Sequence, residues 1–421
     1  MTGPEKWEPP VMVLVGVGVG PGDLTGDALR WIARGQVIAG AARHLGLFPE
    51  HPGRRIAWQS GLEPFLERLD EASRYERTVM LASGDPLFFG IGSRLIRQMG
   101  RDRVVIVPGI TSVQALFGRL REPWEDVRVL SLHGREEEGL EWKLLYAVGR
   151  YPRLAVFTDP VHTPGWIARK LLDAGVAGRR MVVAEDLGQA TENIGRYSLE
   201  EVLLREFSSL NLVAVFCEER SGRRDLTGIP VFGFSEEMFQ HEAGLITKVE
   251  VRALVLASLQ LGPGQVLWDL GAGSGSVSIE ASRIAPLGRV IAVERDENRI
   301  RDLRENLRRF QCYEISAVHG NALDVMDGLP DPDRVFVGGS GGELERMLGK
   351  LSPRLRPGGR VVQTAVTLET LETARRFWKT MGMEVSVTQL HSSRSTSIGG
   401  SVRLDAMNPV FVITAFSRGV A

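Results

Sequence analysis

Cysteine is scarce in this chain: Cys217 and Cys312 are the only two in 421 residues. Two cysteines cannot build the disulfide framework of a small secreted domain, and they fit the reducing cytoplasm, where we expect the protein to act. Neither cysteine has a CxxC partner and the seven histidines are dispersed, so we expect no metal site. Met1–Pro10 lacks a signal-peptide pattern, and the apolar run Val11–Val19 is too short to cross a bilayer.

An excess of one charge is also lacking. The formal net charge is −1, so the sequence offers no electrostatic case for binding nucleic acid or an anionic membrane. Glycine, by contrast, is abundant, with 48 residues, many of them in turns after apolar runs. With 421 residues, 43% of them hydrophobic and 24% charged, the chain predicts a globular protein of two domains.

Apolar runs alternate with helical patterns, which predicts an α/β fold with mainly parallel sheets covered on both faces. The polar stretch Glu218–Gly228 predicts a linker, and we place the domains at residues 1–234 and 235–421. In the first domain we expect strands at Val11–Val19, Gln36–Ala39, Thr78–Ala82, Val104–Val107, Val127–Leu132, Leu154–Thr158, Met181–Glu185 and Asn211–Glu218. In the second we expect a doubly wound sheet of seven strands with an antiparallel edge pair, at Gln265–Leu270, Arg289–Glu294, Glu314–His319, Arg334–Val337, Arg360–Thr364, Glu384–Gln389 and Pro409–Ala415.

The most informative motif is a glycine turn between a strand and a helix in the second domain. Asp269-Leu-Gly-Ala-Gly-Ser-Gly275 follows an apolar run, and the next strand ends in an acid, Glu294. Glycines let the backbone approach a ligand, the helix start offers free N–H groups, and the carboxylate can accept hydrogen bonds from a ribose diol. The spacing Gly-x-Gly-x-Gly is one residue tighter than the dinucleotide motif, which suits a ligand with a ribose but no pyrophosphate, such as S-adenosylmethionine. The predicted contacts are Asp269, Gly271, Ala272, Gly273, Ser274, Gly275 and Glu294.

Two further residues are placed at this site by position alone. Ala322 follows the third strand, where an adenine would rest; the alternative is an ordinary loop residue. Thr247 precedes the first helix of the domain and is a candidate contact to the methionyl end, or simply a helix cap.

Three glycine- and proline-containing turns mark the first domain. Each directly follows an apolar strand, so all three can line one crevice at the carboxyl ends of a sheet. Proline fixes φ in these turns, and the neighbouring glycines expose amide groups. The predicted cofactor contacts in this crevice are Gly18, Gly20, Pro21, Gly22, Gly84, Asp85, Thr111 and Ser112.

These motifs resemble those of known families. Gly18–Gly22, Ala82–Pro86 and Pro108–Ser112, together with Thr158-Asp159-Pro160 and Ala184–Gly188, resemble the carbon-5 branch of the tetrapyrrole (corrin/porphyrin) methylases. The second domain resembles the precorrin carbon-15 methylases in Ile246–Lys248, Asp269–Gly275, Phe336–Gly339 and Asn408-Pro409. In this order the two halves resemble the fused, decarboxylating precorrin C5,15-methyltransferases of cobalamin biosynthesis, and the resemblance covers nearly the whole chain.

The resemblance implies a two-lobed tetrapyrrole methylase fold followed by a Rossmann-like class I methyltransferase. It also implies S-adenosylmethionine as cofactor and a precorrin tetrapyrrole as partner: precorrin-6B would be methylated at carbons 5 and 15 and lose the ring C acetate carboxyl group, giving precorrin-8X. Gly338 and Gly339 would leave room for the substrate, unless they only form a flexible loop. Arg394 and Arg403 would bind its carboxylates, and the alternative for them is a solvated hairpin tip. Relatives of both halves self-associate, so we expect a homo-oligomer.

No catalytic acid or base is assigned, since the bridging carbons of a reduced tetrapyrrole are enamine-like and already nucleophilic; His133, at a strand end, is not expected to be a base. Several alternatives stay open. The substrate can be a cobalt-precorrin, or only one of the two domains can be active. A nicotinamide oxidoreductase also uses a glycine turn with an acid, although the Gly-x-Gly-x-Gly spacing argues against it. A binding or scaffold protein that has lost activity is the last alternative, and the intact turns in both halves argue against it.

Overall fold

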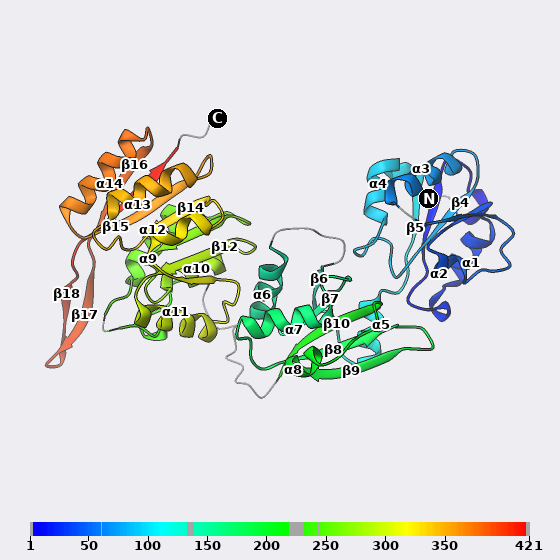
Figure 1. The fold of residues 1–421 in the computed structure, drawn as a ribbon, viewed down its shortest axis with the longest axis horizontal. Helices are drawn as coiled ribbons and strands as arrows, with labels where there is room; N and C mark the ends of the chain where they lie inside the picture. Colours follow the sequence, from blue (N-terminus) through cyan, green and yellow to red (C-terminus); the bar gives the residue numbers. More distant parts are fainter. Residues whose placement is uncertain (1–2, 60, 133–138, 219–230, 243, 418–421) are drawn as a thin grey trace. The chain divides into compact units, whose positions relative to one another are not determined.

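The computed structural model describes residues 3–59, 61–132, 139–218, 231–242 and 244–417, and the chain forms two compact units (Figure 1). The first unit comprises Met1–Glu136, Tyr151–Arg169 and Arg179–Glu218. The second comprises Glu137–Arg150, Lys170–Gly178 and Glu219–Ala421. Apart from Glu218, the predicted linker up to Gly228 lies outside the described residues.

The first unit begins with a parallel sheet of five strands in the order β3-β2-β4-β1-β5. Its strands are β1 (Met12–Gly16), β2 (Val37–Gly40), β3 (Arg54–Ala57), β4 (Thr78–Ala82) and β5 (Val104–Val107). The accompanying helices are α1 (Gly26–Ala33), α2 (Ala42–Leu45), α3 (Leu62–Ser73) and α4 (Gly92–Met99). Apolar clusters pack on both faces of the sheet, which explains why its central strands are nearly continuous apolar runs.

A second five-stranded sheet, in the order β6-β7-β10-β8-β9, makes the other lobe of the first unit. Its strands are β6 (Arg128–Ser131), β7 (Arg153–Phe157), β8 (Arg179–Glu185), β9 (Asn193–Ser198) and β10 (Asn211–Cys217). Helices α5 (Ser112–Leu120) and α8 (Leu199–Leu203) belong to the first unit. Helix α6 (Leu140–Arg150) belongs to the second unit, and α7 (Pro164–Asp173) is divided between the two units after Arg169. The expectation of mainly parallel pairing is wrong here: β6 and β7 are parallel, but β10 pairs antiparallel with both β7 and β8. A buried apolar run reads the same in either direction, so the sequence does not reveal this.

The seven-stranded sheet of the second unit has the order β13-β12-β11-β14-β15-β19-β16. The strands are β11 (Val266–Leu270), β12 (Arg289–Glu294), β13 (Ser316–His319), β14 (Arg334–Val337), β15 (Arg360–Ala365), β16 (Glu384–Leu390) and β19 (Val410–Phe416). Strand β19 runs antiparallel between β15 and β16, so the predicted doubly wound sheet with an antiparallel edge pair is confirmed.

Helices cover both faces of this sheet, with α9, α10 and α11 over one apolar core and α12, α13 and α14 over the other. Their bounds are α9 (Val249–Leu259), α10 (Ser276–Ile284), α11 (Glu297–Arg309), α12 (Ala322–Val325), α13 (Leu344–Leu351) and α14 (Leu368–Thr380). Two fully buried tryptophans, Trp268 and Trp378, belong to the second of these cores. Among the described helices, none is long and apolar enough to cross a membrane.

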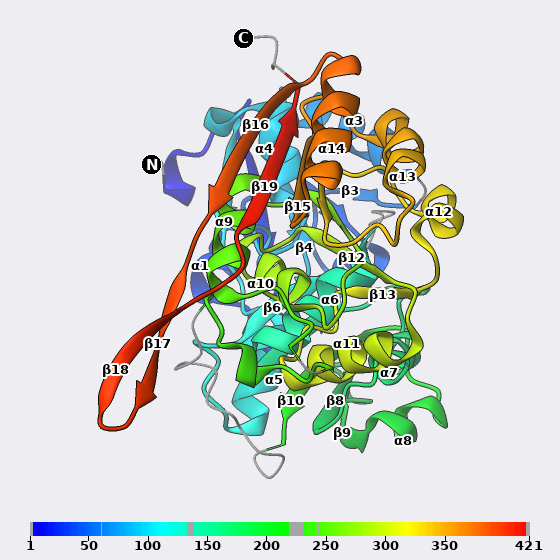
Figure 2. The ribbon, with the colours of Figure 1, turned by 90° about the vertical axis from the view of Figure 1, so that its left-hand side faces the viewer.

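A two-stranded arm, β17 (Ser393–Ile398) and β18 (Ser401–Ala406), projects from the ends of β16 and β19 (Figures 1 and 2). Gly399 and Gly400 form its tip with φ of +52° and +84°, as a tight two-residue hairpin requires. Most of its side chains are exposed.

Candidate functional site

The glycine turn of the second unit connects β11 to α10. Gly271, Gly273 and Gly275 have φ of +76°, +56° and +81°, in the left-handed region that favours glycine. Gly275 is the N-cap of α10 and provides no side-chain cap, so the first helical turn lacks the side-chain acceptor that usually pairs with its amides.

The carboxylate of Glu294 bonds directly to this turn. At the end of β12, Glu294 is almost fully buried; its Oε2 accepts from the Gly273 amide at 2.8 Å and its Oε1 accepts from the Asp296 amide at 2.9 Å. Each carboxylate oxygen has a further lone pair, so Glu294 can still accept hydrogen bonds from a diol.

A cavity of about 210 Å³ lies beside the turn. Of the predicted residues, the cavity lining includes Gly271, Glu294, Ala322, Gly338 and Gly339, which lie at or just after the ends of the four strands β11, β12, β13 and β14. The cavity is also lined by Arg295, Arg299 and Asn321, which were not among the predicted contacts. Their positions just after β12 and β13 were the available signal, because loops at the carboxyl ends of parallel strands share one edge of the sheet.

Gly271 and the loop after β14 meet backbone to backbone. A Cβ added to Gly271 would lie 2.8 Å from the Gly339 carbonyl oxygen, and one added to Gly338 would lie 3.0 Å from the Gly271 oxygen. Glycine is therefore needed here for the close approach of two main chains.

Asp269 lies beneath the turn, fully buried, and its Oδ2 accepts from the Ser278 hydroxyl of α10 at 2.6 Å. Burial raises the pKa of Asp269 to about 7, and the nearby Glu294 charge acts in the same direction. Its Oδ1 has no hydrogen-bond partner among the described residues. Asp269 thus ties the turn to α10, and it does not line the cavity.

In the first unit, the three predicted turns contact one another through their backbones. The Gly84 amide donates to the Gly18 oxygen at 2.9 Å, and both glycines have positive φ. A Cβ added to Gly109, in the third turn, would lie 2.4 Å from the Gly84 oxygen. The predicted convergence of these turns at one sheet edge is therefore seen in the structure.

Several polar residues of these turns are engaged in holding the turns themselves. Asp23 Oδ2 accepts from the amides of Val19 and Gly20 at 2.9 and 3.1 Å. Asp85 Oδ1 accepts from the Leu87 amide at 2.8 Å. Thr111 caps α5, accepting from the Gln114 amide at 3.1 Å, so its hydroxyl has a structural role irrespective of any ligand.

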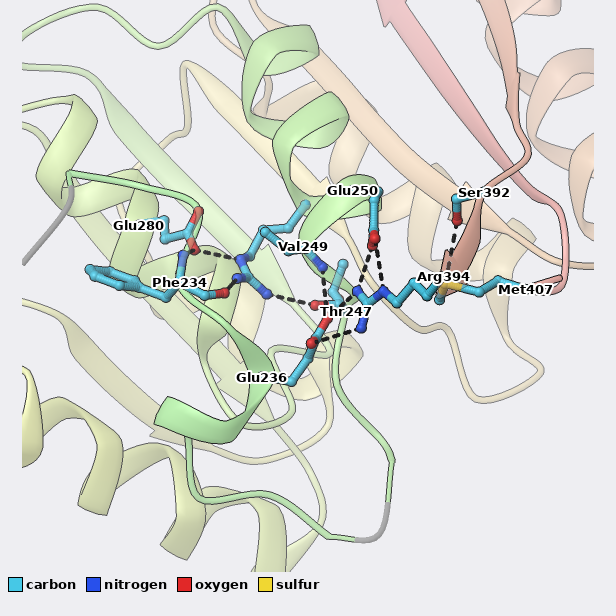
Figure 3. Close-up of polar contacts among 10 residues, drawn as sticks. Phe234, Glu236, Thr247, Val249, Glu250, Glu280, Ser392, Arg394 and Met407 are labelled. Carbon is cyan, nitrogen blue, oxygen red and sulfur yellow. Dashed lines mark hydrogen bonds and ion pairs between the residues drawn. The ribbon is translucent and has the colours of Figure 1, made fainter. Parts of the chain in front are cut away.

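The two predicted substrate arginines are both paired with carboxylates. Arg394 of the arm lies between Glu236 and Glu250 (Figure 3) and donates to Glu250 at 2.8 and 2.6 Å and to Glu236 at 3.1 and 2.8 Å. Arg403 pairs with Asp405 at 2.7 Å on the exposed face of the arm. Arg394 therefore has a different environment from that expected of a free carboxylate anchor.

The Thr247 carbonyl accepts from Arg252 at 2.7 Å, and Arg252 also donates to the buried Glu280 at 2.7 Å. Lys248, rather than Thr247, is the N-cap of α9, so the alternative that Thr247 is a simple helix cap is wrong. His133 lies outside the described residues.

Comparison with known proteins defines the class. Residues 13–203 match the family model of the tetrapyrrole (corrin/porphyrin) methylases, and residues 237–417 match that of the precorrin methyltransferase domain. Together with three open-edged α/β sheets and two glycine-lined turn systems, these matches define a methyltransferase.

The chain is 31% identical over 410 residues to a precorrin-6Y C(5,15)-methyltransferase [decarboxylating] of a Sinorhizobium species, which is 97% of this chain and 96% of that protein. A protein of the same name from Mycobacterium tuberculosis is 32% identical over 391 residues, covering 89% and 92%. A cobalt-precorrin-6B C(15)-methyltransferase (decarboxylating) of Salmonella typhimurium is 40% identical over 169 residues, covering 40% and 87%. The chain belongs to the family of the decarboxylating precorrin-6Y C5,15-methyltransferases.

Proposed function

We propose that this protein methylates precorrin-6B at carbons 5 and 15 and removes the carboxyl group of the ring C acetate, giving precorrin-8X for cobalamin biosynthesis. The proposal is carried by the presence of two separate glycine-lined turn systems in one chain. That chain aligns over 97% of its length with the precorrin-6Y C(5,15)-methyltransferase [decarboxylating] of a Sinorhizobium species. The methyl donor would be S-adenosylmethionine, which supplies an electrophilic methyl group on a sulfonium.

The residues of the second unit fit such a donor. Glu294 would accept from the ribose hydroxyls, Ala322 would pack against the adenine, and Gly271, Ala272, Gly273, Ser274 and Gly275 would bring main-chain groups to the ligand. Asp269 would act through the turn, because its side chain is buried behind it. Thr247 is kept as a contact to the methionyl end.

In the first unit, Gly18, Gly20, Pro21, Gly22, Gly84, Asp85, Thr111 and Ser112 would bind the second donor molecule through main-chain groups. Their side chains are small or already engaged, which supports a main-chain mode of binding. The chain's task in each unit is then to align a nucleophilic carbon with the methyl group and to exclude water.

We assign methylation of carbon 5 to the domain 1–234. Methylation of carbon 15 and the decarboxylation are assigned to the domain 235–421. The Salmonella C(15) relative supports this division, because it matches 40% of the chain, about the length of one domain. Gly338 and Gly339 would leave room for the macrocycle, whose extended conjugation would accept the electron pair left by carbon dioxide. Arg403 and, on release from its two glutamates, Arg394 are the candidates for its carboxylates. We place the protein in the cytoplasm as a homo-oligomer.

The test is mass spectrometry of metal-free precorrin-6B after incubation with the protein and methyl-labelled S-adenosylmethionine. Two labelled methyl groups with loss of carbon dioxide are expected. A single methyl group would assign activity to one domain only, and turnover of the cobalt-loaded substrate alone would replace precorrin-6B by a cobalt-precorrin. Tighter equilibrium binding of NADH than of S-adenosylmethionine would instead favour an oxidoreductase.

A further inference from the structure

One cluster in the first unit has no part in the function proposed so far: Asp159 and His162, in the loop after β7. Strands β6 and β7 are parallel, and β10 is antiparallel to both β7 and β8, so β6, β7 and β8 all end at the same edge of the second sheet. Thr158 Oγ1 donates to Asn211 Oδ1 at 2.8 Å, and Asn211 is paired in register with Glu185 at the end of β8. The loop that carries Asp159 and His162 is therefore fixed at this edge.

The same edge meets two of the three turns that we propose to bind the methyl donor. At the end of β8, the Gly188 oxygen lies so close to Gly20 that a Cβ added there would be 2.5 Å away. At the end of β7, the Phe157 ring lies 6.2 Å from Phe88 and 5.6 Å from Phe89, in the turn that follows Asp85. Asp159 and His162 thus lie one short loop beyond a point of contact between the two lobes of this unit.

The geometry of the pair fixes which ring nitrogen is available. His162 Nδ1 lies 3.0 Å from Asp159 Oδ2 and 3.1 Å from Oδ1, and Oδ1 also accepts from the Val161 amide at 2.9 Å. Although burial opposes it, these hydrogen bonds from the His162 main chain and ring and from Val161 lower the pKa of Asp159. An ionised carboxylate at this distance requires a proton on Nδ1, and in the neutral imidazole the lone pair is then on Nε2.

The ring is held firmly and its second nitrogen is available. Trp166 of α7 packs against the His162 ring at 4.8 Å with an interplanar angle of 88°. The side chains of His162 and Asp159 are only 17% and 10% exposed. Within the described part of the chain, Nε2 of His162 makes no hydrogen bond.

A turn-capping role explains only half of this arrangement. Asp159 Oδ1 accepts both amides of the turn, and a turn needs no more than that. Asp159 Oδ2 is directed to the imidazole instead. A carboxylate that orients a histidine with a free Nε2 is the arrangement that makes imidazole a general base.

We propose that His162 accepts the proton that the tetrapyrrole loses when the first unit methylates it; this rests on the proposed function. In the balanced step, the carbon–sulfur bond of the sulfonium breaks with its electron pair retained by sulfur. An electron pair of the enamine-like carbon forms the new carbon–carbon bond. A proton of the resulting cation passes to Nε2, its electron pair restores the conjugated system, and His162 later releases the proton to water. Asp159 is a positioning residue.

Two other charged groups that the structure describes at this edge are engaged elsewhere. Glu185 of β8 accepts from the Asn193 side chain at 2.9 Å and from the Ser208 amide at 2.7 Å. Asp186 accepts from the hydroxyls of Ser208 and Thr191 at 2.8 and 3.2 Å. Among the described residues, Asp159 is the charged group in contact with the His162 ring.

The experiment measures both methyl transfers in the full chain as a function of pH, by mass spectrometry with labelled donor. The variants are His162→Gln and Asp159→Asn, and the control is His241→Gln, a histidine of the second unit. In His162→Gln we expect carbon-5 methylation to fall about 100-fold and its rise with pH to disappear. Carbon-15 methylation and decarboxylation serve as the internal control and should not change. Asp159→Asn should move the rise to lower pH, because a neutral amide no longer stabilises the protonated ring.

A wild-type rate and pH profile for carbon 5 in His162→Gln would overturn the role of His162 while leaving the proposed function intact. If the wild-type protein adds no methyl group at carbon 5, the proposed function fails, and this inference fails with it. Loss of both products in His162→Gln would show a folding defect, and Asp159→Asn then decides: a shifted profile supports the proposal, and an unshifted one overturns it.

Discussion

The two glycine-lined turn systems of this protein are held in place by different hydrogen bonds. In the second unit, the carboxylate of Glu294 on the neighbouring strand accepts a hydrogen bond from the Gly273 amide of the turn. A cavity lies beside this turn. In the first unit, the turns bond to one another, and the acid that takes their amides, Asp23, comes from the first turn itself. The difference predicts that side-chain chemistry matters more in the second site, and main-chain fit more in the first.

The largest effect should come from adding one methyl group at the main-chain contacts. In Gly109→Ala the new Cβ would lie 2.4 Å from the Gly84 oxygen and 2.8 Å from Gly16, all main chain that cannot rotate away. We expect carbon-5 methylation to fall at least about 100-fold, by analogy with the cost of misplacing reacting groups, while carbon-15 methylation persists. Product mass spectra report both.

In Gly271→Ala we expect carbon-15 methylation to fall while carbon-5 methylation persists, because the new Cβ would lie 2.8 Å from the Gly339 backbone. Gly273→Ala is the matched control: it also has positive φ, but a Cβ there has no atom within 4 Å. It should cost only about 1–2 kcal/mol of backbone strain. An equal loss of carbon-15 methylation in Gly271→Ala and Gly273→Ala would mean that backbone strain, rather than the close contact of the new Cβ, determines the effect.

The second comparison concerns the buried acid of the second site. Since burial raises the pKa of Asp269 to about 7, above its usual value of 3.8, Asp269 favours folding while protonated. This stabilisation is fully present below about pH 4 and is lost as the pH rises through 7. Asp269→Asn removes the titration while keeping an acceptor for Ser278.

The difference in unfolding free energy between Asp269→Asn and the wild type should therefore change between pH 5 and 8, by on the order of 3 kcal/mol in favour of the variant at the higher pH. Denaturant unfolding of both proteins at several pH values measures it. A pH-independent difference would show that Asp269 is ionised throughout this range.

Glu294→Gln tests the acid that distinguishes the second site. The amide oxygen can still accept from Gly273, but the charge that strengthens hydrogen bonds to a ribose is lost. We expect the Kd for S-adenosylmethionine in the second unit to rise about tenfold, or about 1.4 kcal/mol. Glu305→Gln on the exposed face of α11 is the control, and calorimetry the measurement. An unchanged Kd for Glu294→Gln would remove the ribose role.

The comparison also shows what the sequence could predict. The turn at Asp269–Gly275 was recognisable because strand, glycines, helix and acid follow in one short stretch. The edge strands β3 and β9 were not recognisable from the sequence. Exposed strands carry polar residues such as Arg54 and Arg196, and they lack an apolar run. The strands of the arm were missed for the same reason, with Ser393–Ile398 almost wholly polar.

Pairings between distant residues were beyond the reach of local patterns. Asp23 directly follows the predicted contact Gly22, yet its carboxylate accepts from amides of its own turn. Arg394 lies 144 residues beyond Glu250 in the chain, and no spacing rule connects them. Such contacts depend on how the strands are ordered, which a single sequence does not state.

The smallest expected effect concerns Arg394, for which two roles are opposed. Its hydrogen bonds lower the pKa of Glu236 to about 2, although burial opposes them. A lowered pKa stabilises the fold above the unfolded value, near 4.5, and the contribution is lost as the pH falls toward 2. Because Arg394 is 39% exposed, we expect Arg394→Ala to cost only about 1 kcal/mol at pH 7 and less at pH 3.

Thermal unfolding at the two pH values, together with tetrapyrrole binding, separates the roles of Arg394. If it anchors the arm, stability falls at pH 7 and tetrapyrrole affinity follows only indirectly. If it binds a substrate carboxylate, the Kd for the tetrapyrrole rises while stability and S-adenosylmethionine affinity stay unchanged. Arg375→Ala is the control, because Arg375 makes an exposed pair with Glu372 on α14 and no binding role is proposed for it, so its loss should leave stability and tetrapyrrole affinity unchanged. Since two carboxylates already satisfy the guanidinium, we expect the first outcome: the arm's arginine holds the arm to the start of α9.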